Sequence, residues 1–122
     1  MIAGMCHCGA VAWQFEGVPA SLTRCNCSIC SRYAALWAYG TTANVTVIAA
    51  PDATIAYSHG DQMIAFHSCR VCGCTTHYLS LTTDSYADRV AVNMRMAAAA
   101  DFAAIPIRDF DGAESWTYLN ES

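Results

Sequence analysis

The stretch MCHCGAV, residues 5–11, places Cys6 and Cys8 one residue apart near the start of the chain. In extended backbone, residues i and i+2 point to the same side, so this C-x-C pair presents both sulfur atoms on one face. Farther along, Cys69 and Cys72 form a C-x2-C pair, a spacing that needs the tight turn found in the knuckles of structural zinc sites. The simplest closed metal site joins the two pairs, with four sulfur ligands in a tetrahedron.

A site that joins the two pairs would constrain the fold and limit the choice of metal. It clips the N-terminus to a segment about sixty residues away, which is a useful constraint for a small core. Gly73 directly follows Cys72 and suits a knuckle, because glycine tolerates a positive φ. Ligation by sulfur alone favours zinc or an iron–sulfur cluster. The spacing does not exclude the cluster, although no ferredoxin spacing occurs.

The stretch TRCNCSICSRY, residues 23–33, holds three further cysteines, Cys25, Cys27 and Cys30. Three protein ligands plus an open position are the pattern of a catalytic zinc site, where water or a substrate completes the tetrahedron. A thiol that coordinates zinc loses its proton. The spacing therefore predicts a catalytic zinc that activates an incoming thiol.

Two other interpretations of these three cysteines stay open. One of His59, His67 and His77 is a candidate fourth ligand, which would close the site and favour a non-catalytic binding module. Without metal, three crowded thiols oxidise readily, which would suit a redox sensor that forms a reversible disulfide.

The eighth cysteine, Cys74, lies two residues after Cys72. In extended backbone it would face the same side and compete as a ligand, but a lone extra cysteine is more often a small buried hydrophobe. His7 lies between two ligands, so we expect it to point away from them as a surface or packing residue.

Composition excludes several classes of function. The length of 122 residues predicts one domain, residues 1–122. The net charge is −4, and all six basic residues are arginines, without a basic stripe, so nucleic-acid binding is not expected. No apolar run reaches the roughly 18 residues of a membrane span. The N-terminus lacks the pattern of a signal peptide, so we expect the reducing cytoplasm, where clustered cysteines bind metal more often than they form disulfides.

Short β-type segments separated by turn residues predict a mainly antiparallel β fold with one or two short helices. The expected strands are residues 11–15, 36–39, 45–48, 54–57, 63–66, 76–81, 90–93 and 116–119. The alanine-rich stretch 96–105 is the best helical candidate, ended by Pro106, and a second helical turn is expected near Cys30.

Aromatic residues supply the expected core: Trp13, Trp37, Trp116, Tyr33, Tyr39 and Phe66. Of these, Tyr33 and Trp37 are the best candidates to line a pocket beside the three cysteines.

Polar candidates complete the prediction. Arg24 and Arg32 flank the three cysteines and are candidates to hold an anionic substrate group. Asn93 and Arg95 are candidates either for substrate contact or for a hydrogen-bonding role at the end of a strand. Asp111 and Gly112 predict a turn.

The order of these motifs resembles the glutathione-dependent formaldehyde-activating enzyme family, which includes the centromere-protein-V-like proteins. The matching pieces are CHCGAV at 6–11, CNCSIC at 25–30, CRVCG at 69–73, VNMR at 92–95 and FDGAESW at 110–116. These pieces follow the family's order from residue 6 to residue 116.

The resemblance implies the small zinc-binding β fold shared with methionine-sulfoxide reductase B and the Rab-GTPase chaperones. It implies a structural zinc on Cys6, Cys8, Cys69 and Cys72, and a catalytic zinc on Cys25, Cys27 and Cys30, which makes two Zn²⁺ per chain. The implied activity is that of a carbon–sulfur lyase, which joins glutathione and formaldehyde into S-hydroxymethylglutathione. The implied partners are thus a small thiol and a small aldehyde.

Overall fold

In the computed structural model, which describes residues 1–119, buried and less buried side chains alternate along β2 (Val11–Phe15). Val11, Trp13 and Phe15 point inward, as expected for a strand with one buried face. β2 is the centre of a three-stranded sheet, between β1 (Ile2–Met5) and β5 (Val45–Ala49).

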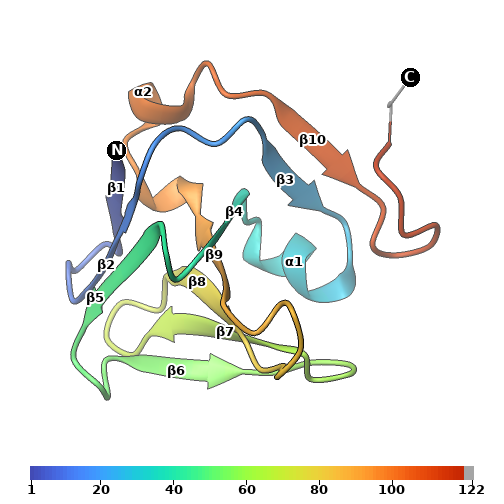
Figure 1. The fold of residues 1–122 in the computed structure, drawn as a ribbon. Coiled ribbons are helices and arrows are strands. Elements are labelled where there is room, and N and C mark those ends of the chain that lie inside the picture. The colour runs from blue at the N-terminus through green and yellow to red at the C-terminus, as the bar shows by residue number, and fades with distance from the viewer. Residues whose placement is uncertain (120–122) are drawn as a thin grey trace.

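The second sheet has seven strands, which carry or adjoin most of the cysteines. In sheet order these are β10 (Ile107–Phe110), β3 (Leu22–Cys25), β4 (Trp37–Thr41), β9 (Arg89–Asn93), β8 (Thr75–Ser80), β7 (Ile64–Cys69) and β6 (Thr54–Tyr57). Neighbours pair antiparallel except β10 and β3, which run parallel, side by side in Figure 1. The helices are α1 (Ser28–Tyr33), the 3₁₀ helix η1 (Met94–Met96) and α2 (Ala99–Phe102).

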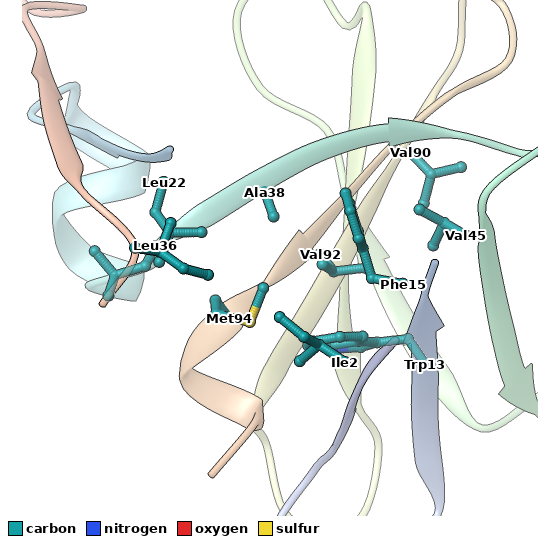
Figure 2. Packing of buried hydrophobic residues seen from close by; sticks show 11 residues of the cluster. Ile2, Trp13, Phe15, Leu22, Leu36, Ala38, Val45, Val90, Val92 and Met94 are labelled. Carbon is teal, nitrogen blue, oxygen red and sulfur yellow. The ribbon is translucent and has the colours of Figure 1, made fainter. Parts of the chain in front are cut away.

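The main core lies between the two sheets. Figure 2 shows Ile2 and Trp13 of the smaller sheet pointing towards Val92 of β9 and Met94 of η1. These four side chains are at most 5% exposed. Burying them removes apolar surface from water and fixes the larger sheet against the smaller one.

Gly4 of β1 is packed directly against this core. A Cβ at position 4 would lie 2.5 Å from Cζ2 of Trp13, so the indole ring leaves no room for a side chain there. Gly4→Ala is expected to lower the free energy of unfolding by about 1–3 kcal/mol, the usual cost of overpacking a core. Urea denaturation measures this loss. Ala3→Val on the exposed side of the same strand is the control and should change stability little, and an equal loss in both variants would contradict the packing argument.

The predicted β class with short helices is confirmed, and β2 and β6 have the predicted bounds. Five other predicted strands are present with ends shifted by a few residues, and α1 includes Cys30. β1, β3 and β10 were not predicted.

Two predictions about the C-terminal part of the chain are wrong, and a third holds only in part. Residues 116–119 are no strand, because Trp116 has a φ of +57° and only an isolated bridge from Phe110 to Tyr118 forms. Trp116 is 71% exposed and lies outside the core. The stretch 96–105 forms only the single turn of α2, because Met96 belongs to η1 and the next residue, Ala97, bridges to β1.

Within residues 1–119, none of the helices has the length and apolar character needed to span a bilayer.

Candidate metal centres

The first candidate metal centre brings together two distant parts of the chain. Cys6 and Cys8 lie between β1 and β2, Cys69 ends β7, and Cys72 lies in the turn before β8. The four sulfur atoms of this four-cysteine cluster lie within 4.8 Å of one another. The Sγ atoms of Cys6 and Cys8 are 3.7 Å apart, and those of Cys8 and Cys69 are 3.5 Å apart. A tetrahedral zinc with bonds of ~2.3 Å has sulfur–sulfur edges of ~3.8 Å, so these residues fit the ion.

Backbone geometry around the four-cysteine cluster is that of a thiolate site. The N–H of Val11 donates to Sγ of Cys6 at 3.3 Å, and the N–H of Val71 donates to Sγ of Cys69 at 3.4 Å. Gly73, directly after Cys72, has the predicted positive φ of +81°. Hydrogen bonding from the N–H of Cys74, with a smaller effect of other donors, lowers the pKa of Cys72 to about 5. N–H donors of this kind stabilise negative charge on sulfur.

Cys74 itself is half-buried and packs against the apolar cluster of Cys6, Val11 and Cys69. Its carbonyl accepts a hydrogen bond from the N–H of Cys69 at 2.8 Å, while its sulfur is not one of the four that gather. This agrees with the packing role expected for it.

The second candidate metal centre comes from one short stretch of the chain, residues 25–30. Cys25 ends β3, Cys27 is the N-cap of α1, and Cys30 lies within α1. The sulfur atoms of this three-cysteine cluster lie within 4.8 Å of one another. No fourth His, Cys, Asp or Glu from residues 1–119 joins the group. The donor set therefore fits a metal ion with three protein ligands.

Hydrogen bonds hold the sulfur atoms of the three-cysteine cluster in place. The N–H of Cys30 donates to Sγ of Cys27 at 3.4 Å, and the indole N–H of Trp37 donates to Sγ of Cys30 at 3.4 Å. A hydrogen bond from Cys30, then the N–H groups of Cys27 and Gly112, lowers the pKa of Cys25 to about 5. The same hydrogen bond, together with burial, raises the pKa of Cys30, which is the proton donor of the pair.

The segment 111–117 covers this cluster and is fastened by the predicted turn. The side-chain amide of Asn26 donates to Oδ1 of Asp111 at 3.0 Å, and the N–H of Ala113 donates back to Oδ1 of Asn26 at 3.0 Å. A Cβ at Gly112 would lie 2.6 Å from Sγ of Cys25. Gly112 is therefore the residue that lets this segment approach the sulfur atoms.

Gly112→Ala is expected to push the segment and Cys25 apart. We expect metal affinity at the three-cysteine cluster to fall about tenfold or more, in the range found when groups that orient metal ligands are disturbed. Competition with a colorimetric zinc chelator measures this change. Glu114→Ala in the same exposed segment is the control, and equal affinities for Gly112→Ala and wild type would contradict the contact.

Two cavities adjoin the three-cysteine cluster. The larger has a volume of about 810 Å³ and reaches Cys25, Cys27 and Cys30. The smaller, about 390 Å³, reaches Cys25 and Cys30 from another side. The cluster is thus accessible to small molecules, as a site of chemistry requires.

A model of the glutathione-dependent formaldehyde-activating enzyme family matches residues 1–105. The chain belongs to this family. The match includes all eight cysteines and the VNMR segment, and it ends before FDGAESW. The family's fold resembles the zinc β domain of methionine-sulfoxide reductase B, as the resemblance implied.

A solved structure of a Rhodobacter sphaeroides protein from a structural-genomics programme is similar to this chain. The two share 28% sequence identity with a TM-score of 0.68, over 87% of this chain and 99% of the other. No curated protein gave a significant match.

The histidines of this family member are not ligands in either group. His67 and His77 stack on each other with ring centroids 4.8 Å apart, and their Nδ1 atoms are hydrogen bonded to Thr54 and Thr76. They do not line the larger cavity, so neither is placed to be a fourth ligand, and each is instead an ordinary histidine with a hydrogen bond to a threonine. His59 does line this cavity.

The arginines and Asn93 form hydrogen bonds within the protein more than the sequence predicted. Arg24 lines the smaller cavity, but its Nε donates to Asp109 at 2.6 Å. Arg32 donates to the carbonyl of Ser28 at 2.7 Å and lines neither cavity, so its expected contact with substrate is not supported.

Asn93 is buried, and its side-chain oxygen accepts a hydrogen bond from the N–H of Leu36. This is the hydrogen-bonding role at the end of a strand that was one of its two predicted roles. Arg95 lines the smaller cavity and donates to the carbonyl of Ala34.

Sequence reasoning found only part of the larger cavity. Trp37 lines it as expected, whereas Tyr33 packs outside it against Phe66. The cavity also includes residues that no sequence pattern indicated, among them Tyr78, Arg89 and Tyr118. No local signal could have found them, because they come from separate strands and loops.

Proposed function

We propose that this protein is a zinc-dependent carbon–sulfur lyase acting on thiol–aldehyde adducts, of the type that interconverts glutathione plus formaldehyde and S-hydroxymethylglutathione. One observation carries the proposal: the three-cysteine cluster lies at the wall of a cavity and gathers three sulfur ligands rather than four. The four-cysteine cluster has the closed donor set of a structural zinc, so we assign it that role. Family membership supports the reaction type.

Cys25, Cys27 and Cys30 would hold the catalytic zinc. When bound, this ion supplies Lewis acidity and lowers the pKa of a thiol that reaches it. The protein's own part is to keep the three sulfur atoms in position. The indole N–H of Trp37 and the N–H of Gly112 donate to the sulfurs of Cys30 and Cys25, which spreads negative charge off the thiolates.

The reaction itself is a reversible addition. In the forward direction a C–S bond and an O–H bond form while the S–H bond and the carbonyl π bond break, so no oxidant or reductant is needed. Water can supply the proton to the carbonyl oxygen. Because the uncatalysed addition is already easy, the cavity contributes mainly by holding thiol and aldehyde together.

The alternatives differ in what they require of the three cysteines. A non-catalytic binding module was expected to close the site with a histidine, but among residues 1–119 no histidine joins the group. A redox sensor would instead form a disulfide between sulfur atoms this close, and its low-pKa thiol would be Cys25.

Exchange spectroscopy by NMR tests the proposal. With glutathione and formaldehyde, zinc-loaded protein should speed interconversion with S-hydroxymethylglutathione above the uncatalysed rate, and zinc-free protein should not. The same rate with zinc-loaded protein, zinc-free protein and buffer would overturn the proposal.

A further inference from the structure

The larger cavity is much larger than formaldehyde requires. A one-carbon aldehyde occupies about the volume of one or two water molecules, roughly 30–60 Å³. The cavity has about 810 Å³, within the range of pockets that bury whole drug-sized ligands. An adduct of formaldehyde with a small thiol would leave much of this space unfilled, and an unfilled apolar space forfeits contact energy.

The wall next to the metal ligands is aromatic. Trp37, Phe66 and Tyr78 form a packed group whose ring centroids lie 5.1 to 5.9 Å apart, and Trp37 also donates its indole N–H to Sγ of Cys30. All three side chains line the cavity. The three side chains are at most 7% exposed, so a planar ring bonded to the reacting carbon would meet the narrow part of their ring surface that faces the cavity.

The cavity also has one strongly cationic group. Arg89 is the only arginine that lines it among residues 1–119, and the chain has no lysine. The guanidinium carbon of Arg89 lies 5.3 Å from the ring centroid of Tyr39 and 5.1 Å from that of Tyr86. These two rings, together with a hydrogen bond to the side chain of Tyr78, hold the guanidinium in place, and its other N–H groups are suited to a carboxylate.

A further wall is supplied by the C-terminal segment. Phe110, Trp116 and Tyr118 line the cavity, and their rings contact one another at 4.9 and 5.0 Å. This segment lies beyond the residues 1–105 that the family model matches. The C-terminal segment thus adds to the aromatic surface of the cavity.

We propose, resting on the function proposed above, that the adducts processed by this protein are those of an aromatic aldehyde that carries one anionic group. The ring lies against Trp37, Phe66 and Tyr78, and the anionic group pairs with Arg89. In the cleavage direction the C–S electron pair stays with sulfur, the hydroxyl proton of the adduct passes through water to the thiolate, and the carbonyl forms. The products are the thiol and the aromatic aldehyde, with no change in oxidation state.

Stable thioethers of one thiol test this inference without turnover. We would titrate the zinc-loaded full chain with the S-methyl, S-benzyl and S-(4-carboxybenzyl) derivatives of N-acetylcysteine in a calorimeter. The benzyl compound should bind at least about tenfold more tightly than the methyl compound, and the carboxybenzyl compound more tightly again. Equal affinities for the methyl and benzyl compounds would overturn the inference.

Two pairs of variants assign the effect to the cavity. In Arg89→Gln the carboxybenzyl compound should bind no more tightly than the benzyl compound, while the benzyl compound should still bind more tightly than the methyl compound. Arg32 lies outside both cavities, so Arg32→Gln should keep both differences in affinity. Tyr86→Ser should weaken binding of the carboxybenzyl compound severalfold, because it releases Arg89, whereas Tyr57→Ser, also exposed but outside the cavity, should not. Losses of equal size in a variant and its control would contradict the assignment.

The outcome separates this inference from the proposed lyase activity. Turnover of the formaldehyde adduct together with equal binding of all three thioethers would leave the lyase standing and refute the aromatic substrate. Preferential binding of the benzyl compounds without turnover of any adduct would refute the lyase and keep the assignment of the cavity.

Discussion

Cys69→Ala is expected to unfold the protein. Cys69 is 2% exposed, and its sulfur lies 3.5 Å from that of Cys8, so it joins the N-terminal strands to the larger sheet through the four-cysteine cluster. Structural zinc contributes about 10–16 kcal/mol of apparent binding free energy in small domains. This exceeds or matches the roughly 5–15 kcal/mol by which native proteins are stable. Far-UV circular dichroism and the emission of the buried Trp13 and Trp37 measure the loss of structure.

The matched control for this prediction is Cys74→Ala. Cys74 is close in sequence and half-buried, but its sulfur lies outside the four-cysteine cluster, so its loss should cost only about 1–2 kcal/mol. Removing zinc from wild-type protein with a chelator should reproduce the effect of Cys69→Ala. A folded Cys69→Ala protein with unchanged thermal stability would contradict the structural role of the cluster.

Cys25→Ala is expected to abolish activity and keep the fold. Cys25 is a half-buried residue at the end of β3, and its loss leaves two sulfur ligands at the three-cysteine cluster while the four-cysteine cluster stays whole. Zinc content should fall by one ion per chain, and the rate of adduct interconversion should fall by at least about a hundredfold, since even outer groups around a metal cost 10–100-fold. Elemental analysis and exchange spectroscopy measure the two effects.

Circular dichroism provides the control for Cys25→Ala, which should melt within a few degrees of wild type. A variant that keeps both zinc ions and its turnover would show that Cys25 is not a ligand. A variant that unfolds would show that the two clusters do not divide structure from chemistry in the way proposed.

The four-cysteine and three-cysteine clusters could be predicted from the sequence, because the spacing of cysteines limits which sulfur atoms can reach one ion. The C-x-C of Cys6 and Cys8 and the C-x2-C of Cys69 and Cys72 can each place two sulfur atoms on one ion, and only one other group of three cysteines remains. The observed sulfur positions agree with this division.

The missed strands lack a local signal. β10 (Ile107–Phe110) pairs in parallel with β3 (Leu22–Cys25), so its hydrogen bonds join residues about 85 positions apart. Both are short and carry charged residues, Arg24 and Asp109, whose ion pair forms only once the strands lie side by side. The alternation of apolar and polar residues therefore did not indicate that these two segments are strands.

The shape of the cavity was equally hidden. Trp37 could be placed near the three-cysteine cluster because it follows Cys30 closely, but Arg89 and Trp116 come from β9 and from the C-terminal segment. The positive φ of Trp116 removes it from the predicted strand and leaves it at the cavity wall. Tertiary contacts, and no local propensity, decide these positions.

Zinc content per chain, measured on wild-type protein purified without oxygen, tests the division of the cysteines most directly. The account predicts two ions per chain, one of which is lost in Cys25→Ala without loss of structure. A single ion, with a disulfide among Cys25, Cys27 and Cys30, would contradict the catalytic zinc and favour the redox sensor.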